Sequence, residues 1–536
     1  MQDDSYLNNL QYNSCISRGI CSINPRTYAL QNVLGLYLQL CAKYCIKLFE
    51  KDCLKDDIKN FILNTVAVAV SNPEFTENCF IETIEELRKI LPDLIKTHNE
   101  IYGADDFESE DILSAEIFKK CENIVDAIKF GEYIFQEKVS KISETIRNFF
   151  KIMLILARSI SVNILDLESY SNDSTLNNDI EKTAFLYLLT LLNSMNTSCT
   201  DLDKLKELIY KSAESNTKLI ELLHSAQEKR YGKQKVTDIS YTTTPSKAVL
   251  AVGSNIRELE TILENLKNTE IDVYTHDDMM VAHTFPKFNE YDNLKGQYGH
   301  GLENCLIDFA TFPGPIILTK HSLHNIENLY RGRLFTTDIN FYKGVIKIEN
   351  DNFDEVISSA QESKGFKRGK VCETVTIGYD YDESINHIKE RLESNLYKKV
   401  VVIGLKDYSF EKKSYFEKLV KLLSDDILII SFSYNIKRDN LLYFNACFDS
   451  HAVVRIVSDL IDYDIPLNIY LPKCGRNTLA EMIYFAKFDK IAVYMGECEP
   501  IMVNSSVKQT LQDNFGIKVI SSAKKDAEEV NKLSND

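Results

Sequence analysis

The chain lacks the surplus of positive charge that a nucleic-acid-binding protein needs. Its 536 residues contain 62 lysines and arginines against 79 aspartates and glutamates, which gives a formal net charge of −17 at pH 7. Phosphate binding depends on clustered lysine and arginine side chains, and an anionic membrane surface repels an acidic protein. The charge balance therefore argues against nucleic acid and against an anionic membrane as the main partner.

Long hydrophobic runs and a secretory leader are also lacking. The longest apolar runs, FLYLLTLL and IMLILA, are far shorter than the ~20 residues that a membrane-spanning helix needs. The N-terminal stretch MQDDSYLNNLQYNS has no basic region followed by an apolar core. We expect a soluble, cytoplasmic protein whose 13 cysteines are reduced thiols or metal ligands rather than a disulfide framework.

Three common site motifs are missing as well. No Gly-x-Gly-x-x-Gly follows the first strand of either expected α/β domain, and no P-loop is present. The sequence also contains no Gly-x-Ser-x-Gly nucleophile elbow. Nucleotide binding is therefore not supported, and neither is a serine nucleophile of that type.

The sequence contains two regions with different patterns of apolar residues. Up to about residue 230, apolar residues recur at three- and four-residue steps, as in YALQNVLGLYLQLCAKYCIKLFE, which is typical of helical bundles. After the polar segment 228–247, short strand-type runs alternate with helical patterns, and Asn255 is the expected N-cap of the first of these helices. The sequence predicts a helical-bundle domain over 1–235 and two Rossmann-like α/β domains with mainly parallel sheets over 236–385 and 386–536.

Seven short runs in the second half of the chain have the character of strands. They are KAVLAVGS, IDVYTH, GPIILTK, KVVVIGL, DILIISFS, IPLNIYLP and KIAVYMG. Each is a short apolar run bounded by polar or turn residues, which is the pattern of a strand buried in a parallel sheet.

One stretch, DVYTHDDMMVAHTFP, begins inside an expected strand and runs past its carboxyl end, where open α/β sheets bind ligands. Its His276, Asp277, Asp278 and His283 could hold a hard or borderline metal. The alternative is a capped loop in which an acid accepts backbone N–H bonds. The residue types are compatible with both the metal site and the capped loop.

Three further groups have a functional and a structural interpretation. Cys15 and Cys21 form a C-x5-C pair that could hold a metal with other ligands, whereas Cys41 and Cys45, one helical turn apart, are expected to be core cysteines. The third group is a cluster of basic and hydroxyl side chains, namely Arg331, Arg333, Thr336 and Thr337. It could hold an anion or order a loop.

Several segments, in order, resemble a known family. They are SCISRGICSINPRTYALQNVL, the block from AVGSNIRELE to FPGPIILTK, YRGRLFTTD, CFDSHAVVRIVSDLIDYDIPLNIYL and VKQTLQDNFGI. They are similar to the hybrid-cluster proteins, also called prismane proteins or hydroxylamine reductases, which are relatives of the nickel–iron carbon monoxide dehydrogenases. The resemblance implies a helical N-terminal domain followed by two Rossmann-like domains. It also implies an iron–sulfur cubane, a hybrid iron–sulfur–oxygen cluster, and reduction of hydroxylamine or nitric oxide.

Few of the family's ligand positions keep their residue types. At the cubane motif, Cys15 and Cys21 match the last two of four cysteines, and the first two fall on Asp3 and Tyr6. At the hybrid cluster, Cys447 is retained and Asp278 stands in place of a glutamate. The substituted hybrid-cluster positions are Ser254 for a histidine, Ser322, Lys406 and Ser433 for cysteines, and Gly475 for a glutamate, with Asn477 in place of a nearby lysine.

Iron–sulfur clusters are held by thiolates, and a serine oxygen is a harder ligand with a much higher pKa. We therefore predict a degenerate family member with incomplete or absent clusters and little or no reductase activity. The alternative is an active oxidoreductase that takes a small nitrogen oxide and an electron donor and works at a modified iron–sulfur cluster. If any cluster is present, the retained ligands are Cys15 and Cys21 at the cubane and Asp278 and Cys447 at the hybrid cluster. Asp278 is then the candidate catalytic residue.

Two further alternatives stay open at this point. One is a homo-oligomer built on the pairing surface that the family uses. The other is a new mononuclear metal or anion site in the old cavity, formed by Asp278, His276, His283 and His321.

Overall fold

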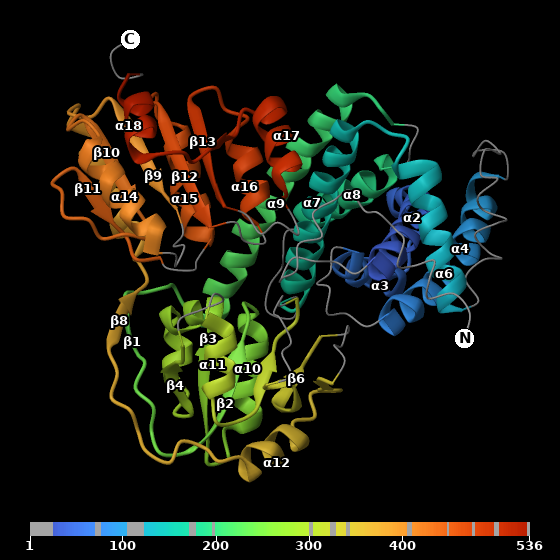
Figure 1. Cartoon of the computed structure of the whole chain (residues 1–536), viewed down its shortest axis with the longest axis horizontal. Coiled ribbons are helices and arrows are strands. Elements are labelled where there is room, and N and C mark those ends of the chain that lie inside the picture. The colour runs from blue at the N-terminus through green and yellow to red at the C-terminus, as the bar shows by residue number, and fades with distance from the viewer. Residues whose placement is uncertain are drawn as a thin grey trace.

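The chain folds into a helical region followed by two α/β units (Figure 1). The computed structural model describes residues 25–69, 77–103, 123–170, 178–195, 199–299, 304–321, 329–338, 344–404, 410–446, 450–473, 477–497 and 503–532. The described helices of the helical region are α2 (Pro25–Glu50), α3 (Asp56–Ala69), α4 (Glu77–Tyr102), α6 (Ile124–Ile134), α7 (Glu144–Glu168), α8 (Asn178–Ser194) and α9 (Leu202–Tyr231).

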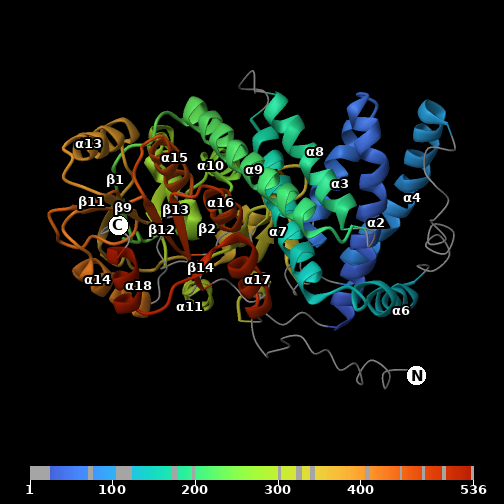
Figure 2. The same cartoon turned by 90° about the horizontal axis from the view of Figure 1, so that it is seen from above.

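Helices α7 and α9 connect this region to the rest of the molecule. Ser143 caps α7 by accepting a hydrogen bond from Ile146 N at 3.3 Å, and the apolar run that follows buries the helix along most of its length. Helix α9 ends at Tyr231, and its C-cap residue Gly232 has φ +88°. Figure 2 shows α7 and α9 lying beside α16 (Thr478–Phe485) and α17 (Ser505–Phe515) of the C-terminal unit, and these helices are in contact.

The first α/β unit is built on a six-stranded parallel sheet in the order β4-β3-β2-β5-β6-β7. Its strands are β2 (Lys247–Val252), β3 (Ile271–His276), β4 (Leu294–Gln297), β5 (Ile316–Leu318), β6 (Leu334–Thr336) and β7 (Ile346–Lys347). The helices are α10 (Ile256–Leu266), α11 (Cys305–Thr311) and α12 (Asp354–Glu362), and short 3-10 turns η3 (Asp277–Thr284) and η4 (Pro286–Glu290) follow β3.

The second α/β unit repeats this arrangement with the order β11-β10-β9-β12-β13-β14, again all parallel. Its strands are β9 (Lys399–Ile403), β10 (Ile427–Ser431), β11 (Leu441–Tyr443), β12 (Leu467–Lys473), β13 (Ile491–Glu497) and β14 (Lys518–Val519). The helices besides α16 and α17 are α13 (Tyr381–Glu393), α14 (Phe410–Leu422), α15 (Ser450–Ile461) and α18 (Ala523–Lys532). A separate antiparallel pair, β1 (Thr237–Ser240) and β8 (Thr374–Ile377), joins the two units.

The predicted fold class is confirmed: a helical N-terminal region precedes two parallel-sheet α/β units. Each predicted strand run contains a strand, because buried parallel strands are apolar on both faces and stand out in the sequence. Asn255 caps α10 as expected, since its side chain accepts from Glu258 N at 3.0 Å. The boundaries at 235/236 and 385/386 stay predictions. Within the described ranges no helix is long and apolar enough to cross a membrane.

Candidate functional site

Both sheets reverse their winding direction at the centre, and these switch points are where open α/β sheets bind ligands. In the first sheet the reversal lies between β2 and β5, and in the second between β9 and β12. Ser254 follows β2, Asp278 follows β3 and Ser433 follows β10, so each described candidate lies just beyond a strand's carboxyl end. The other predicted positions lie outside the described residues: Asp3, Tyr6, Cys15, Cys21, Ser322, Lys406, Cys447 and Gly475.

The loop that carries Asp278 is held by its two histidines. His276 is fully buried, and its Nε2 lies 3.0 Å from Asp308 Oδ2. His283 Nε2 lies 2.8 Å from the hydroxyl of Thr275, which is also 2.6 Å from the side-chain amide of Gln297. Burial lowers the pKa of His283 to about 4, so this imidazole is neutral near pH 7. Both rings are therefore engaged in the framework of the loop.

Asp277, between them, has the uncommon backbone angle φ +60°. This left-handed residue turns the chain sharply at the end of β3, and it leaves Asp278 half-buried. Among the described residues, no three histidine, cysteine, aspartate or glutamate side chains form a group that could hold a metal. A new mononuclear metal site made of Asp278, His276, His283 and His321, all of them described, is therefore not formed.

The remaining described site residues do not carry cluster-type donors. Ser254 is exposed, and its neighbour Asn255 is committed to the helix cap. Ser433 is buried and donates its hydroxyl hydrogen bond to the backbone carbonyl of Gly404. The described ligand positions thus offer one carboxylate and two hydroxyls.

The basic and hydroxyl cluster around β6, which consists of Arg331, Arg333, Thr336 and Thr337, orders a loop. Arg333 donates to the backbone carbonyls of Phe309 at 2.8 Å and Gly314 at 2.9 Å. Thr336 donates to Leu318 O at 3.0 Å, and Thr337 donates to the Glu258 carboxylate at 2.5 Å. These side chains donate their hydrogen bonds to acceptors within the protein. Their contacts therefore favour the loop-ordering interpretation over an anion site.

Helix α7 contacts the chain beside three of the substituted ligand positions. Arg158 Nη2 donates to His321 O at 3.3 Å, next to the Ser322 position. Asn255 Nδ2, next to Ser254, donates to Asp166 Oδ1 at 3.0 Å. Asn163 Nδ2 donates to Asn477 Oδ1 at 3.0 Å, two residues beyond the Gly475 position. One helix thus contacts the loops of both α/β units.

The Asn163 contact is part of a buried group of three amides. Its Nδ2 also lies 2.9 Å from Asn216 Oδ1 on α9. The exposed fractions are 0% for Asn163, 0% for Asn216 and 8% for Asn477. All three side chains are neutral, and together they join α7 and α9 to the start of α16. We call this group the amide triad.

The sequence patterns did not predict the contacts of the amide triad or of the other polar residues of α7. The available signal was that Asn163 and the other polar residues of α7 occur inside an apolar helix, in the run IMLILARSISVNILDLE. Buried polar side chains need partners, so such residues mark contacts with other elements, but the sequence does not say which.

The core cysteines behave as predicted. Cys41 and Cys45 are fully buried in α2, and burial raises the pKa of Cys41 to about 12 and that of Cys45 well above its ordinary value. A thiol with a raised pKa is a poor source of the thiolate that metals bind. Neither side chain is suited to replace a missing cubane ligand.

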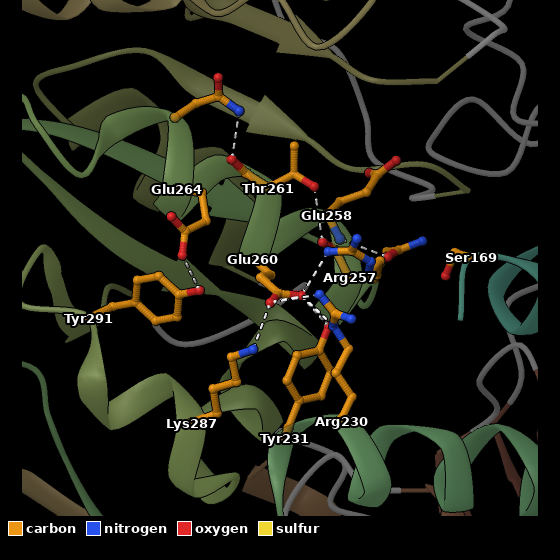
Figure 3. A network of polar contacts seen from close by, with 12 residues as sticks. Ser169, Arg230, Tyr231, Arg257, Glu258, Glu260, Thr261, Glu264, Lys287 and Tyr291 are labelled. Atoms are coloured by element: carbon orange, nitrogen blue, oxygen red, sulfur yellow. Dashed lines mark hydrogen bonds and ion pairs between the residues drawn. The ribbon is translucent and has the colours of Figure 1, made fainter. Parts of the chain in front are cut away.

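A second polar network joins the helical region to the first α/β unit (Figure 3). Arg230 Nε and the hydroxyl of Tyr231, at the end of α9, donate to the buried Glu260 carboxylate at 2.8 and 2.9 Å. Arg257 Nη1 approaches the same carboxylate at 2.7 Å, and Lys287 Nζ at 3.2 Å. Three cations therefore surround one carboxylate at this junction.

Comparison with known proteins identifies the family. The model of the Prismane/CO dehydrogenase family matches residues 11–438. The chain belongs to this family. Among its similar relatives, the hydroxylamine reductase of Thermodesulfovibrio yellowstonii is 24% identical, over 97% of this chain and 98% of its own. That of Methanocella arvoryzae is 22% identical over 96% of both chains, and that of Salmonella paratyphi C is 21% identical over 97% of both.

The family match confirms the prismane-type resemblance expected from the sequence. Among solved structures, carbon monoxide dehydrogenase IV from Carboxydothermus hydrogenoformans is similar at 12% identity and a TM-score of 0.48. That similarity covers 96% of this prismane-family chain and 89% of the other.

The described residues at the family's hybrid-cluster positions do not fit an iron–sulfur cluster. Such clusters are held mainly by thiolates, whereas the described part of the site contributes Asp278, Ser254 and Ser433. The hydroxyl of Ser433 is already bonded to backbone, and Asn477, two residues after Gly475 in the sequence, belongs to the amide triad. These side chains therefore do not support a redox step through a cluster.

Proposed function

We propose that this prismane-family protein has lost its reductase clusters and keeps the fold for a structural or regulatory role. The observation that supports this is the row of contacts from α7 to the residues beside three substituted ligand positions. Direct hydrogen bonds tie the described residues His321, Asn255 and Asn477 to α7, and none of these bonds involves a metal.

The electrostatics of the site support the same proposal. Removing thiolates while keeping a cluster would leave iron without its preferred ligands. The amide triad, in contrast, consists of neutral side chains, and the hydrogen bonds from Asn163 to Asn216 and Asn477 need no charge nearby. At the position of the family's lysine the chain has Asn477, whose amide can be buried at far smaller cost than an ammonium.

The test is metal and activity analysis of protein made anaerobically in iron-replete cells. The hydroxylamine reductase of Salmonella paratyphi C, prepared in parallel, is the positive control. We expect substoichiometric iron and acid-labile sulfide, no cluster signal in electron paramagnetic resonance, and no hydroxylamine reduction above buffer. Stoichiometric iron and sulfide with a cluster signal would overturn the proposal.

The second candidate is an active oxidoreductase that reduces hydroxylamine or nitric oxide at a modified cluster, using an electron donor. It is favoured by the relatives named hydroxylamine reductase, which align over nearly the whole chain. Its candidate ligands are Cys15, Cys21, Asp278 and Cys447. If iron is found, Asp278→Asn and Cys447→Ser should each reduce the iron content and the activity together.

A further inference from the structure

An exposed basic segment lies away from the candidate site, just before β8 of the antiparallel pair that joins the two α/β units. Residues 364–371 read KGFKRGKV and contain four cations, Lys364, Lys367, Arg368 and Lys370, in a chain whose net charge is −17. We call these eight residues the basic ribbon. All four cationic side chains are exposed, and within the described part of the chain none forms an ion pair.

The backbone of the basic ribbon is held in one conformation. Phe366 N donates to Ser246 O at 2.8 Å, and Thr243 and Lys370 exchange backbone hydrogen bonds at 3.0 and 3.1 Å. The bonds continue into the register of β1 and β8, where Ser240 pairs with Thr374. The cations are thus presented on a rigid support.

Two glycines and an aromatic ring explain why the ribbon lies so close to the sheet. A Cβ on Gly365 would lie 2.5 Å from Ser246 O, and one on Gly369 would lie 2.6 Å from Thr243 O. The Phe366 ring packs among Tyr274, Tyr298 and Phe312, with ring centroids 5.6, 5.9 and 5.6 Å away. The segment is anchored underneath, while its charged side chains face solvent.

The position of the ribbon separates it from the candidate site. Ser246, its backbone partner, directly precedes β2, so the ribbon lies at the amino-terminal end of that strand. The candidate site lies at the carboxyl ends of the strands of the same sheet. A partner bound at the ribbon therefore leaves the site residues uncovered.

We propose that the basic ribbon is a docking surface for an acidic segment of another protein. Unpaired cations on a preorganised backbone favour binding of carboxylates, because little conformational freedom is lost on association. Val371, at the end of the ribbon, is 89% exposed and offers an apolar contact beside the charges. A protein segment can supply both carboxylates and an apolar side chain.

The size of the ribbon and the charge of the chain favour this partner over an extended polyanion. Its eight residues span at most ~29 Å, so the ribbon matches a short peptide. The strongly acidic remainder of the chain would repel a long duplex or an anionic membrane beyond the ribbon. The proposal does not depend on whether the protein binds a cluster.

The test measures binding of a fluorescein-labelled peptide of alternating glutamate and leucine to the full-length protein by fluorescence anisotropy. The ribbon variant is K364Q/K367Q/R368Q/K370Q. The matched control, K418Q/K421Q/K524Q/K525Q, removes the same number of exposed, unpaired positive charges from α14 and α18. A short duplex DNA and phosphatidylserine-containing vesicles are tested under the same conditions.

We expect the wild type and the control to bind the peptide alike, with affinity that falls as salt rises, and the ribbon variant to bind it at least about tenfold more weakly. Val371→Ser should weaken binding without changing its salt dependence. The proposal is overturned if the peptide does not bind, or if both quadruple variants lose affinity equally. It is also overturned if DNA or vesicles bind more tightly than the peptide.

Discussion

Asn163 of α7 donates a hydrogen bond to the side chain of Asn477, 314 positions later in the chain, across 3.0 Å in a buried environment. The bond connects the helical region to the second α/β unit, two residues beyond Gly475, where the family resemblance implies a cluster ligand. Together with Asn216, it makes this junction a contact between neutral protein groups.

Asn477→Lys, which restores the residue type expected from the family, should destabilise the protein. A lysine here would place an ammonium among buried amides, and it would break the bond to Asn163. We expect the free energy of unfolding in urea to fall by about 3 kcal/mol. Asn265→Lys, on the exposed side of α10, is the control and should change it by less than about 0.5 kcal/mol. An unchanged stability for Asn477→Lys would show that the amide triad does not hold the junction.

Glu260→Gln should weaken the junction between α9 and α10. Burial alone raises the pKa of Glu260, but hydrogen bonds from Arg230 and Tyr231 and the nearby positive charges bring that pKa below its ordinary value. The folded-state pKa is lowered, so the stabilisation is present above about pH 4.5 and is lost as the pH falls through the folded-state pKa.

At pH 7 the Glu260→Gln variant should lose about 2 kcal/mol of unfolding free energy, measured in urea. Glu264→Gln is the control, because Glu264 is half exposed and bonds only to Tyr291 and Lys267 among the described residues. If both variants lose the same unfolding free energy, the three cations around Glu260 do not stabilise the protein more than the contacts of Glu264 do.

His283 should make the protein sensitive to mild acid. Its folded-state pKa is about 4 because of burial, whereas an unfolded histidine has a pKa near 6.5. The unfolded chain therefore binds a proton first, and stability falls as the pH drops from 6.5 toward 4, by about 3 kcal/mol in total.

His283→Gln should flatten the dependence of unfolding free energy on pH in that window, at the cost of some stability at pH 7. His387→Gln, at an exposed position of α13, should leave the dependence unchanged. If His283→Gln shows the same slope as the wild type, another group carries the acid sensitivity.

The cysteines of α2 should resist modification in the folded protein. Cys41 and Cys45 are buried and their thiol pKa values are raised, while Cys53 is exposed. Iodoacetamide followed by peptide mass spectrometry should find Cys53 alkylated early, and Cys41 and Cys45 only after unfolding. Early labelling of Cys41 would contradict its place in the core.

Local signals were enough to predict much of the architecture. The run KVVVIGL becomes β9 because a strand covered on both faces must be apolar throughout. Asn255 was identified as a cap because capping involves only the next three residues. The placement of Ser254 and Asp278 at carboxyl ends of strands follows from where those strands stop.

The amino-acid sequence by itself thus determined the order of elements and the class of fold, and it predicts substitutions at the family's ligand positions. Only the tertiary structure decided which buried polar groups meet. Asn163 in an apolar helix could have bonded its own backbone, a neighbouring helix or a distant loop, and the packing of α7 against α16 selects Asn477. Hydrogen bonds need their atoms within about 3 Å of each other, and residues hundreds of positions apart come that close only in the folded chain.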